Sequence, residues 1–278
     1  MNTAFQSLGI NLDFNFTMLF GSLVMTRLAM VTATIPFLIG KPVPGTIRLG
    51  FTLMMTIFLY PYLVPADPAA LPRAPVYLFL LFLKEAFYGI SIGIVSSIVF
   101  HAFEAAGSMI DNQRGAAQAR LLIPQLSDQT SVFGNFNFLL GIVVFLTIGG
   151  HLFFLKAVFE SYDLLPLLTL PKASPDFLAM TDEFIRTTGM VLLLSLQLTA
   201  PVLIAIFVAD VILGIMSKAA PAINVWELGF TIRGVVGVLV FFLSIGLVVS
   251  QMGKISIGMI DQLEKVLRLL ALSPNYNI

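Results

Sequence analysis

Six apolar stretches run through this chain, and each is long enough, or nearly so, to cross a lipid bilayer. A membrane helix needs about 20 mostly apolar residues to span a hydrocarbon core about 30 Å thick. None of the stretches alternates polar and apolar residues as the strands of a membrane barrel do. We therefore predict an all-α, polytopic membrane protein, a helical bundle of about six hydrophobic helices. The predicted spans are Phe14–Ile39, Ile47–Val64, Val76–Phe100, Val132–Leu155, Met190–Met216 and Phe230–Val249.

Charge is too scarce in this chain to cover a water-facing surface. Only 11% of its residues are charged, against about 25% in soluble domains. The 15 basic and 15 acidic residues give a net charge of zero, so the long-range attraction that nucleic-acid binding needs is missing. No cysteine is present, which excludes disulfides and cysteine-ligated zinc. We predict one integral membrane domain over residues 1–278, not a soluble enzyme, secreted domain or nucleic-acid binder.

The segments between and after the spans differ in character. Links rich in proline and glycine follow the first two spans, and longer links cover His101–Ser131 and Lys156–Arg186. The tail Lys254–Leu272 places its apolar residues on one helical face. We predict an amphipathic C-terminal helix at a surface, not a seventh span. The N-terminus lacks the basic region of a signal peptide, and the basic residues are too evenly divided to orient the chain.

Several charged residues lie inside the predicted spans. A charge at the centre of a span costs about 2.5–3.5 kcal/mol on insertion scales. Lys84 and Glu85 are adjacent, and we expect neighbours on a helix to diverge, so that Glu85 needs a partner from another segment or chain. Arg27 and Arg233 are near enough to plausible span ends to extend their side chains towards water. Asp210 is the other intramembrane carboxylate.

Rows of small residues accompany these charges. Glu85, Gly89 and Gly93 repeat every four residues, as do Asp210 and Gly214, so each row shares one helix face. Small residues let another helix approach closely. Alternative interpretations are an ion pair within the bundle and ordinary helix packing, but the number of such features in one chain favours a subunit buried in a larger assembly.

A search for catalytic or ligand-binding motifs finds little. No phosphate-binding loop of the G-x-x-x-x-G-K-[ST] type is present. His101 and Glu104 have a spacing that metal ligands use on a helix, but two histidines in separate segments make a weak metal site. No serine has a plausible base nearby. We predict that the protein is not an enzyme and needs neither metal nor cofactor.

Short motifs in a fixed order carry a family resemblance. The link after the third span contains Gly107, Asp111, Arg114 and Gly115. The further motif residues are Gly149, Gly150, His151, Ser161, Tyr162, Asp210, Gly214, Pro221 and Asn224. Their order and spacing resemble the FliR/SctT family of type III secretion export-apparatus membrane proteins, and the D-x-x-R-G and G-G-H patterns favour the injectisome branch over the flagellar one. The chain departs from the family pattern at Ile123, Ala222, Trp226, Thr231 and Arg233.

The resemblance implies a place in an export gate in the bacterial inner membrane. In that family one copy joins FliP/SctR-type and FliQ/SctS-type membrane subunits in a hetero-oligomer, raised towards the periplasm. The channel passes unfolded polypeptide substrates, and the ATPase and the large cytoplasmic export protein are separate subunits. Membrane lipid is a further expected contact, and nucleic acid is not.

From the resemblance and the charges together we assign site residues. Gly107, Asp111, Arg114 and Gly115 are predicted to form a bend that lines or seals the channel, where Asp111 and Arg114 can pair if helical or form a solvated loop pair. A subunit interface is predicted at Glu85, Gly89, Gly93, Asp210, Gly214 and Arg233.

Two other functions stay open at this point. A secondary transporter of a small solute could use Glu85 and Asp210 as proton or ion sites, with Pro201 breaking a helix near the midplane. An absence of internal repeats argues against it. An intramembrane enzyme is disfavoured by the sparse set of nucleophiles and ligands.

Overall fold

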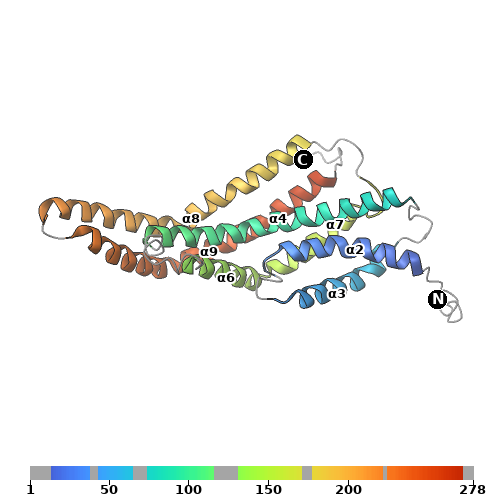
Figure 1. The fold of residues 1–278 in the computed structure, drawn as a ribbon, viewed down its shortest axis with the longest axis horizontal. Helices are drawn as coiled ribbons and strands as arrows, with labels where there is room; N and C mark the ends of the chain where they lie inside the picture. Colours follow the sequence, from blue (N-terminus) through green and yellow to red (C-terminus); the bar gives the residue numbers. More distant parts are fainter. Residues whose placement is uncertain are drawn as a thin grey trace. The chain divides into compact units, whose positions relative to one another are not determined.

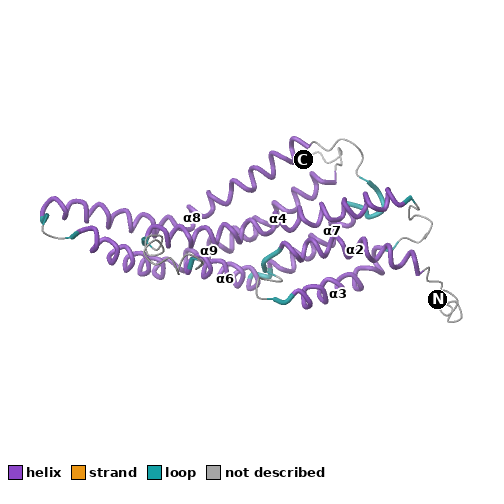
Figure 2. The backbone as a smooth tube through the Cα atoms, in the orientation of Figure 1, coloured by secondary structure: helices purple, strands orange, loops and turns teal. Residues whose placement is uncertain are grey.

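The computed structural model describes residues 14–37, 43–64, 74–115, 131–170, 177–221 and 224–271. Within these ranges the regular structure is entirely helical (Figure 2), which confirms the predicted all-α class. The helices, labelled in Figure 1, are α2 (Phe14–Thr34), α3 (Gly45–Leu63), α4 (Pro75–Gln113), α6 (Val132–Thr147), α7 (Gly150–Leu164), α8 (Phe177–Ala219) and α9 (Val225–Ala271).

Five of these helices are long and apolar enough to cross a membrane, and the bent pair α6 and α7 gives a sixth candidate span. The predicted number of about six is therefore confirmed. Three helices are longer than a span requires, with 39 residues in α4, 43 in α8 and 47 in α9. At about 1.5 Å per residue they measure about 58 to 70 Å, roughly twice the hydrocarbon core.

Several predicted boundaries need correction. Residues 101–113, predicted as a link, continue α4, because Ala, Glu, Met and Gln in this stretch favour helix although the apolar run has ended. Residues 156–164 of the next predicted link are likewise the second half of α7, and residues 177–186 of the same link are the start of α8. The amphipathic tail is the C-terminal part of α9, not a separate helix. Its predicted apolar face is buried, at Leu263, Val266, Leu267 and Leu270.

A glycine turn divides the predicted fourth span into α6 and α7. Gly149 has a φ of 76°, a backbone conformation that residues with a side chain rarely adopt. The axes of the two helices differ in direction by 76°. Ser131 begins α6 as its N-cap, since its side-chain oxygen accepts a hydrogen bond from the backbone N–H of Gly134.

The chain forms two compact units, each built from segments that are separated in sequence. The first consists of Met1–Ser97, His151–Ile185 and Ile260–Ile278, and in it α2 lies against α3. The second consists of Ile98–Gly150 and Arg186–Met259, and its core contains Ile110, Phe133, Val202, Ile206 and Phe241. The prediction of a single domain over residues 1–278 stays a prediction.

Candidate functional site

A fully buried ion pair joins α2 to α4 in the first unit. Arg27 Nε donates to Glu85 Oε2 over 2.6 Å, and both side chains have no exposed surface. Arg27 Nη1 donates to the carbonyl oxygen and the hydroxyl of Ser161, and Nη2 to the carbonyl oxygen of Leu165. The interpretation that Arg27 extends towards water is therefore wrong, because its guanidinium is held in the interior by groups from α4 and α7.

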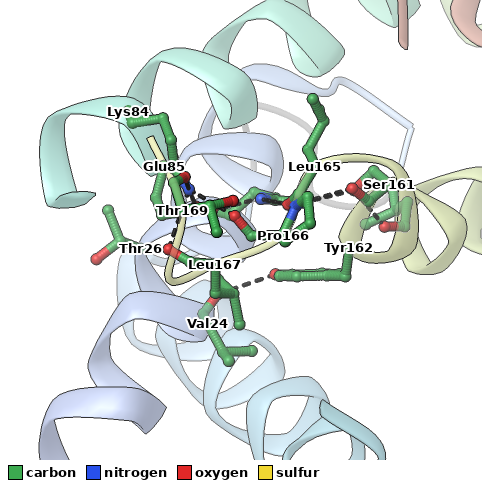
Figure 3. Close-up of polar contacts among 12 residues, drawn as sticks. Val24, Thr26, Lys84, Glu85, Ser161, Tyr162, Leu165, Pro166, Leu167 and Thr169 are labelled. Carbon is green, nitrogen blue, oxygen red and sulfur yellow. Dashed lines mark hydrogen bonds and ion pairs between the residues drawn. The ribbon is translucent and has the colours of Figure 1, made fainter. Parts of the chain in front are cut away.

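Two tyrosines complete the surroundings of this guanidinium. The Arg27 guanidinium carbon lies 4.1 Å from the ring centroid of Tyr162 and 5.5 Å from that of Tyr88. Cation–π attraction of this kind strengthens when water is excluded. The Tyr162 hydroxyl donates to the carbonyl oxygen of Val24 over 3.0 Å (Figure 3). Ser161 and Tyr162, two of the residues that carry the family resemblance, thus both contact α2.

Lys84 forms hydrogen bonds to the link that follows α7. Its Nζ donates to the carbonyl oxygens of Pro166, Leu167 and Thr169 at 2.7, 3.0 and 2.9 Å (Figure 3). The same Nζ lies 2.9 Å from Glu85 Oε1. The expectation that Lys84 and Glu85 diverge is wrong, since the long lysine side chain reaches back beside its neighbour while its other donors contact the link.

The cluster holds two cations and one carboxylate, a formal charge of +1. Buried charges are tolerated only where their donors and acceptors are satisfied. Here the partial negative charges of backbone carbonyl oxygens offset the excess positive charge. These carbonyls belong to Ser161, Leu165, Pro166, Leu167 and Thr169. Ser161 lies in the last turn of α7 and Leu165 directly follows the helix, so both carbonyls are at the end where the helix dipole favours a cation. Sequence reasoning missed Tyr88, although it lies one helical turn after Glu85, and the link carbonyls, which leave no signal in the sequence.

The glycine row of α4 packs against α2 of the same chain. A Cβ added at Gly89 would lie 2.5 Å from the Arg27 carbonyl oxygen and 2.7 Å from Met30 Cβ. At Gly93 an added Cβ would collide with the side chain of Thr34. The row therefore does bring two helices into close contact, as its spacing predicts. Contact of Glu85, Gly89 and Gly93 with another subunit stays a prediction, and Glu85 has no exposed surface within this chain.

A second polar site, in the second unit, joins the end of α4 to the start of α6. Asp111 Oδ2 accepts hydrogen bonds from Ser131 Oγ at 2.6 Å and from the backbone N–H of Phe133 at 3.0 Å. A carboxylate at a helix N-terminus is favoured by the unpaired N–H groups there. Gly107, one helical turn earlier, allows this approach, because an added Cβ would collide with the Phe133 carbonyl.

Arg114 belongs to the same site. Its Nη1 lies 3.4 Å from Asp111 Oδ1, so the predicted pairing of these residues is observed. The guanidinium carbon lies 4.8 Å from the Phe133 ring centroid. A Cβ at Gly237 of α9 would lie 2.8 Å from Arg114 Cγ, so this glycine makes room for the arginine stem.

The predicted bend at residues 107–115 needs correction. Gly107 and Asp111 are helical, because α4 continues to Gln113, and the chain turns only at Gly115, where φ is 89°. Gly107, Asp111 and Arg114 converge on the start of α6. The departures from the family pattern at 123 and 222 lie outside the described residues.

A third polar pair lies between α8 and α9, which form an antiparallel hairpin in the second unit (Figure 1). Arg233 Nε donates to Asp210 Oδ1 over 2.5 Å, and each side chain is about one-third exposed. Large apolar side chains around Asp210 on α8 are also exposed, at Phe207, Val208, Val211 and Ile212. Gly214 is exposed, and an added Cβ would meet nothing within 4 Å.

The remaining motif residues lie at helix ends. Gly149 forms the turn described above. Gly150, the first residue of α7, lies against the ring of Phe145, and His151 is the second residue of that helix. Pro221 is exposed in the hairpin turn. Asn224 precedes α9, and its side-chain amide donates to Glu227 Oε2 over 3.2 Å.

The histidine motif proposed as a weak metal site forms an exposed pair. His101 Nδ1 lies 3.4 Å from Glu104 Oε2. Within the described ranges no group of three histidine, aspartate or glutamate side chains comes close enough to hold a metal ion.

Comparison with known proteins places these features in a family context. A family model described as bacterial export proteins, family 1, matches residues 18–258. The Yop proteins translocation protein T of Yersinia pestis is 32% identical over 90% of this chain and 94% of its own length. The flagellar biosynthetic protein FliR of Bacillus subtilis is 25% identical over 90% and 95% of the two chains. The surface presentation of antigens protein SpaR of Salmonella typhimurium is 27% identical over 80% and 81%.

Proposed function

The chain belongs to the bacterial export proteins, family 1, in the FliR/SctT group, and from this premise we propose that it forms the export gate of a type III secretion system together with smaller membrane subunits. Its relatives are named for translocation and flagellar biosynthesis. With five or six apolar helices, the chain is an integral membrane subunit of an export apparatus.

The observation that carries the proposed assembly is the ion pair of Asp210 and Arg233, whose side chains are each about one-third exposed. Asp210 lies nine residues from the end of α8 at Ala219, a distance of about 14 Å along the helix. If the hairpin tip lies at the headgroup level, this depth is near the middle of a hydrocarbon core about 30 Å thick. An exposed ion pair at that depth is costly against lipid and is expected to face protein or water.

The proposed occupants of this face are the FliP/SctR-type and FliQ/SctS-type subunits. Exposed apolar residues of α8 would pack against their helices, while the remaining donors of Arg233 would bind a polar group of the partner. On α9 an apolar groove of about 700 Å³ with Arg114 in its wall offers a second place for a partner helix. This groove is lined by Phe230, Thr231, Gly234, Val235, Val238, Leu239, Phe242 and Leu243.

We assign the end of α4 to the channel. The direction in which the chain leaves α4 would be set by Gly107, Asp111, Arg114 and Gly115, because Asp111 binds the start of α6. Helices of about 58 to 70 Å exceed the thickness of a bilayer, which supports an assembly raised towards the periplasm. The large cytoplasmic export protein would then contact the end of the assembly that faces the cytoplasm.

The higher identity to the Yop translocation protein, 32% against 25% for FliR, supports the injectisome branch. The proposed role is not enzymatic. Neither carboxylate of the alternative transporter mechanism is free, since Glu85 pairs with Arg27 and Asp210 with Arg233. No observation favours that alternative.

Co-purification tests the proposal. The tagged chain is co-expressed with its two candidate partner subunits, extracted in mild detergent and weighed by native mass spectrometry. We expect a complex that contains one copy of this chain, and Asp210→Arg is expected to weaken it while Lys156→Glu, at an exposed surface pair, is not. A stable monomer or homodimer that ignores both partners would contradict the proposal.

A further inference from the structure

The groove on α9 combines an apolar surface with a single charge. Its volume is about 700 Å³, and all of its lining residues belong to the second unit. Three of them, Val235, Leu239 and Phe242, are more than half exposed. Arg114, which directly follows α4, is the one charged residue in the wall. Contiguous exposed apolar surface of this kind marks an interaction site.

The spacing of the exposed residues fits a helix that lies along α9. Val235, Leu239 and Phe242 follow one another at intervals of four and three residues, the alternation by which helices pack side by side in coiled coils. The lining residues of α9 extend from Phe230 to Leu243, about 20 Å along the helix axis. A partner helix of about four turns would cover this length.

The guanidinium of Arg114 has donors that the described part of the chain does not satisfy. Its Nε is buried and forms no hydrogen bond there. Its Nη1 lies 3.4 Å from Asp111 Oδ1, whereas strong charge-assisted hydrogen bonds measure about 2.7–2.9 Å. The other oxygen of Asp111 accepts from Ser131 and from the Phe133 N–H. Arg114 therefore shares its nearest carboxylate with the start of α6.

Packing keeps Arg114 at the groove. Its stem occupies the space that a side chain at Gly237 would need, and the ring of Phe133 lies against its guanidinium. A helix that covers the groove removes water from this cation. A charge without water needs a counter-charge or hydrogen-bond acceptors, so a wholly apolar helix would be a poor occupant.

We infer that the groove binds one helix of a partner subunit, apolar along its contact face and carrying an aspartate or glutamate opposite Arg114. The inference rests on the proposed function, because the partner comes from the assembled export apparatus. It adds the chemistry by which this partner is recognised. Apolar contact supplies most of the area, and the carboxylate fixes the register of the partner helix along α9, as single polar residues do in helix pairs.

Photocross-linking tests the position of the partner. The photoreactive residue p-benzoylphenylalanine replaces Val235 or Leu239 in the tagged full-length chain, which is produced in cells together with the candidate partner subunits. The joined peptides are identified by mass spectrometry. We expect both positions to capture the same apolar helix of one partner. Because Gly237 lies between the two positions, an aspartate or glutamate is expected within about one turn of the captured residues.

Arg114→Met tests the charge. It leaves the carboxylate of the partner buried without a counter-charge, so capture from Val235 should fall about tenfold or more. Neutralising the identified carboxylate as well, by Asp→Asn or Glu→Gln in the partner, should restore most of the capture. The control is Lys156→Met, which removes a positive charge from an exposed pair in the first unit and should be captured as wild type.

The outcomes separate this inference from the proposed function. If the tagged chain co-purifies with the partner subunits but Val235 and Leu239 capture only lipid or this chain itself, the inference is overturned and the proposed function stands. A captured helix without a nearby carboxylate, unchanged capture in Arg114→Met, or no recovery in the double variant overturns it equally. If Arg114→Met fails to accumulate, the sequence of the captured helix decides. A wild-type chain that binds no partner subunit overturns both.

Discussion

The guanidinium carbon of Arg27 lies 4.1 Å from the ring centroid of Tyr162, and both residues are buried. The preceding residue, Ser161, accepts from the same guanidinium through its carbonyl and its hydroxyl. The last turn of α7 thus binds Arg27 through a ring face and two oxygens. Tyr162 also donates to the Val24 carbonyl, so α7 contacts α2 at Val24 and, one helical turn later, at Arg27.

Two substitutions separate the contributions of Tyr162. Tyr162→Phe keeps the ring over Arg27 and removes the donor to the Val24 carbonyl, so we expect a loss of about 1 kcal/mol in the free energy of unfolding. Tyr162→Leu also removes the ring, and a desolvated cation–π contact adds about 2 kcal/mol to the loss. Unfolding of the purified protein in mixed detergent and SDS measures both. Equal losses for Phe and Leu would contradict a role for the ring face.

Lys84 is expected to control the order of the link after α7. Lys84→Met removes the donors from three carbonyls, so the backbone amides of residues 165 and 167–170 should exchange with deuterium at least tenfold faster. Global stability should fall less than the number of lost bonds suggests, because the substitution also removes the excess positive charge. Lys156→Met is the control, since its pair with Glu160 is exposed and contributes little. Unchanged exchange in the link would show that the carbonyls do not depend on Lys84.

The helical class and the number of spans follow from the apolar runs alone, because membrane-length helices leave a strong local signal. The end of the apolar run does not mark the end of α4, since residues 101–113 are held helical by their propensity and by contact of Gly107 and Asp111 with α6. Likewise the turn at Gly149 interrupts an apolar run that reads as continuous.

Several residues of the candidate site could be predicted from the sequence, but the groups that they contact could not. Glu85 and the glycines of α4 stand out in the sequence, yet one chain does not reveal that Arg27, 58 residues earlier, is the partner. The contributions of Leu165, Pro166, Leu167 and Thr169 come from backbone carbonyls, which every residue has. Such contacts depend on tertiary packing and leave no pattern to read.

We expect that exchanging the charges of Asp111 and Arg114 does not preserve secretion. Asp111 binds Ser131 and the Phe133 N–H at 2.6 and 3.0 Å, whereas Arg114 lies 3.4 Å away. Asp111→Arg therefore places a cation at the positive end of α6 and should abolish secretion. The double variant with Arg114→Asp should not restore it. Secretion assays in a strain lacking the chromosomal copy measure this, and full rescue by the double variant would show that the pair with Arg114 is the main role of Asp111.

Gly149 is expected to be intolerant of a side chain. At a φ of 76°, Gly149→Ala should cost about 1–2 kcal/mol, the penalty for a left-handed conformation. The matched control is Gly246→Ala in α9, where an added Cβ also meets nothing within 4 Å but φ is not positive, so that no stability should be lost. Thermal unfolding in detergent compares the two variants. Equal stability of both variants would contradict a role for the left-handed turn.

A substitution at Gly214 distinguishes an effect on the stability of the chain from an effect on its assembly with partner subunits. An added side chain there meets no atom of this chain within 4 Å, and glycine within a helix is less favourable than alanine by about 0.5–1 kcal/mol. Gly214→Leu should therefore leave the isolated chain as stable as wild type or slightly more so. If this face of α8 packs against a partner subunit, the same substitution should reduce the yield of the co-purified complex severalfold and reduce secretion with it.

Gly189→Leu, at another open glycine of α8 about 37 Å away along the helix, is the control for added bulk and is expected to assemble normally. Normal assembly of both variants would remove Gly214 from the proposed interface, whereas loss of stability in the isolated Gly214→Leu chain would show that the site is packed within the chain itself.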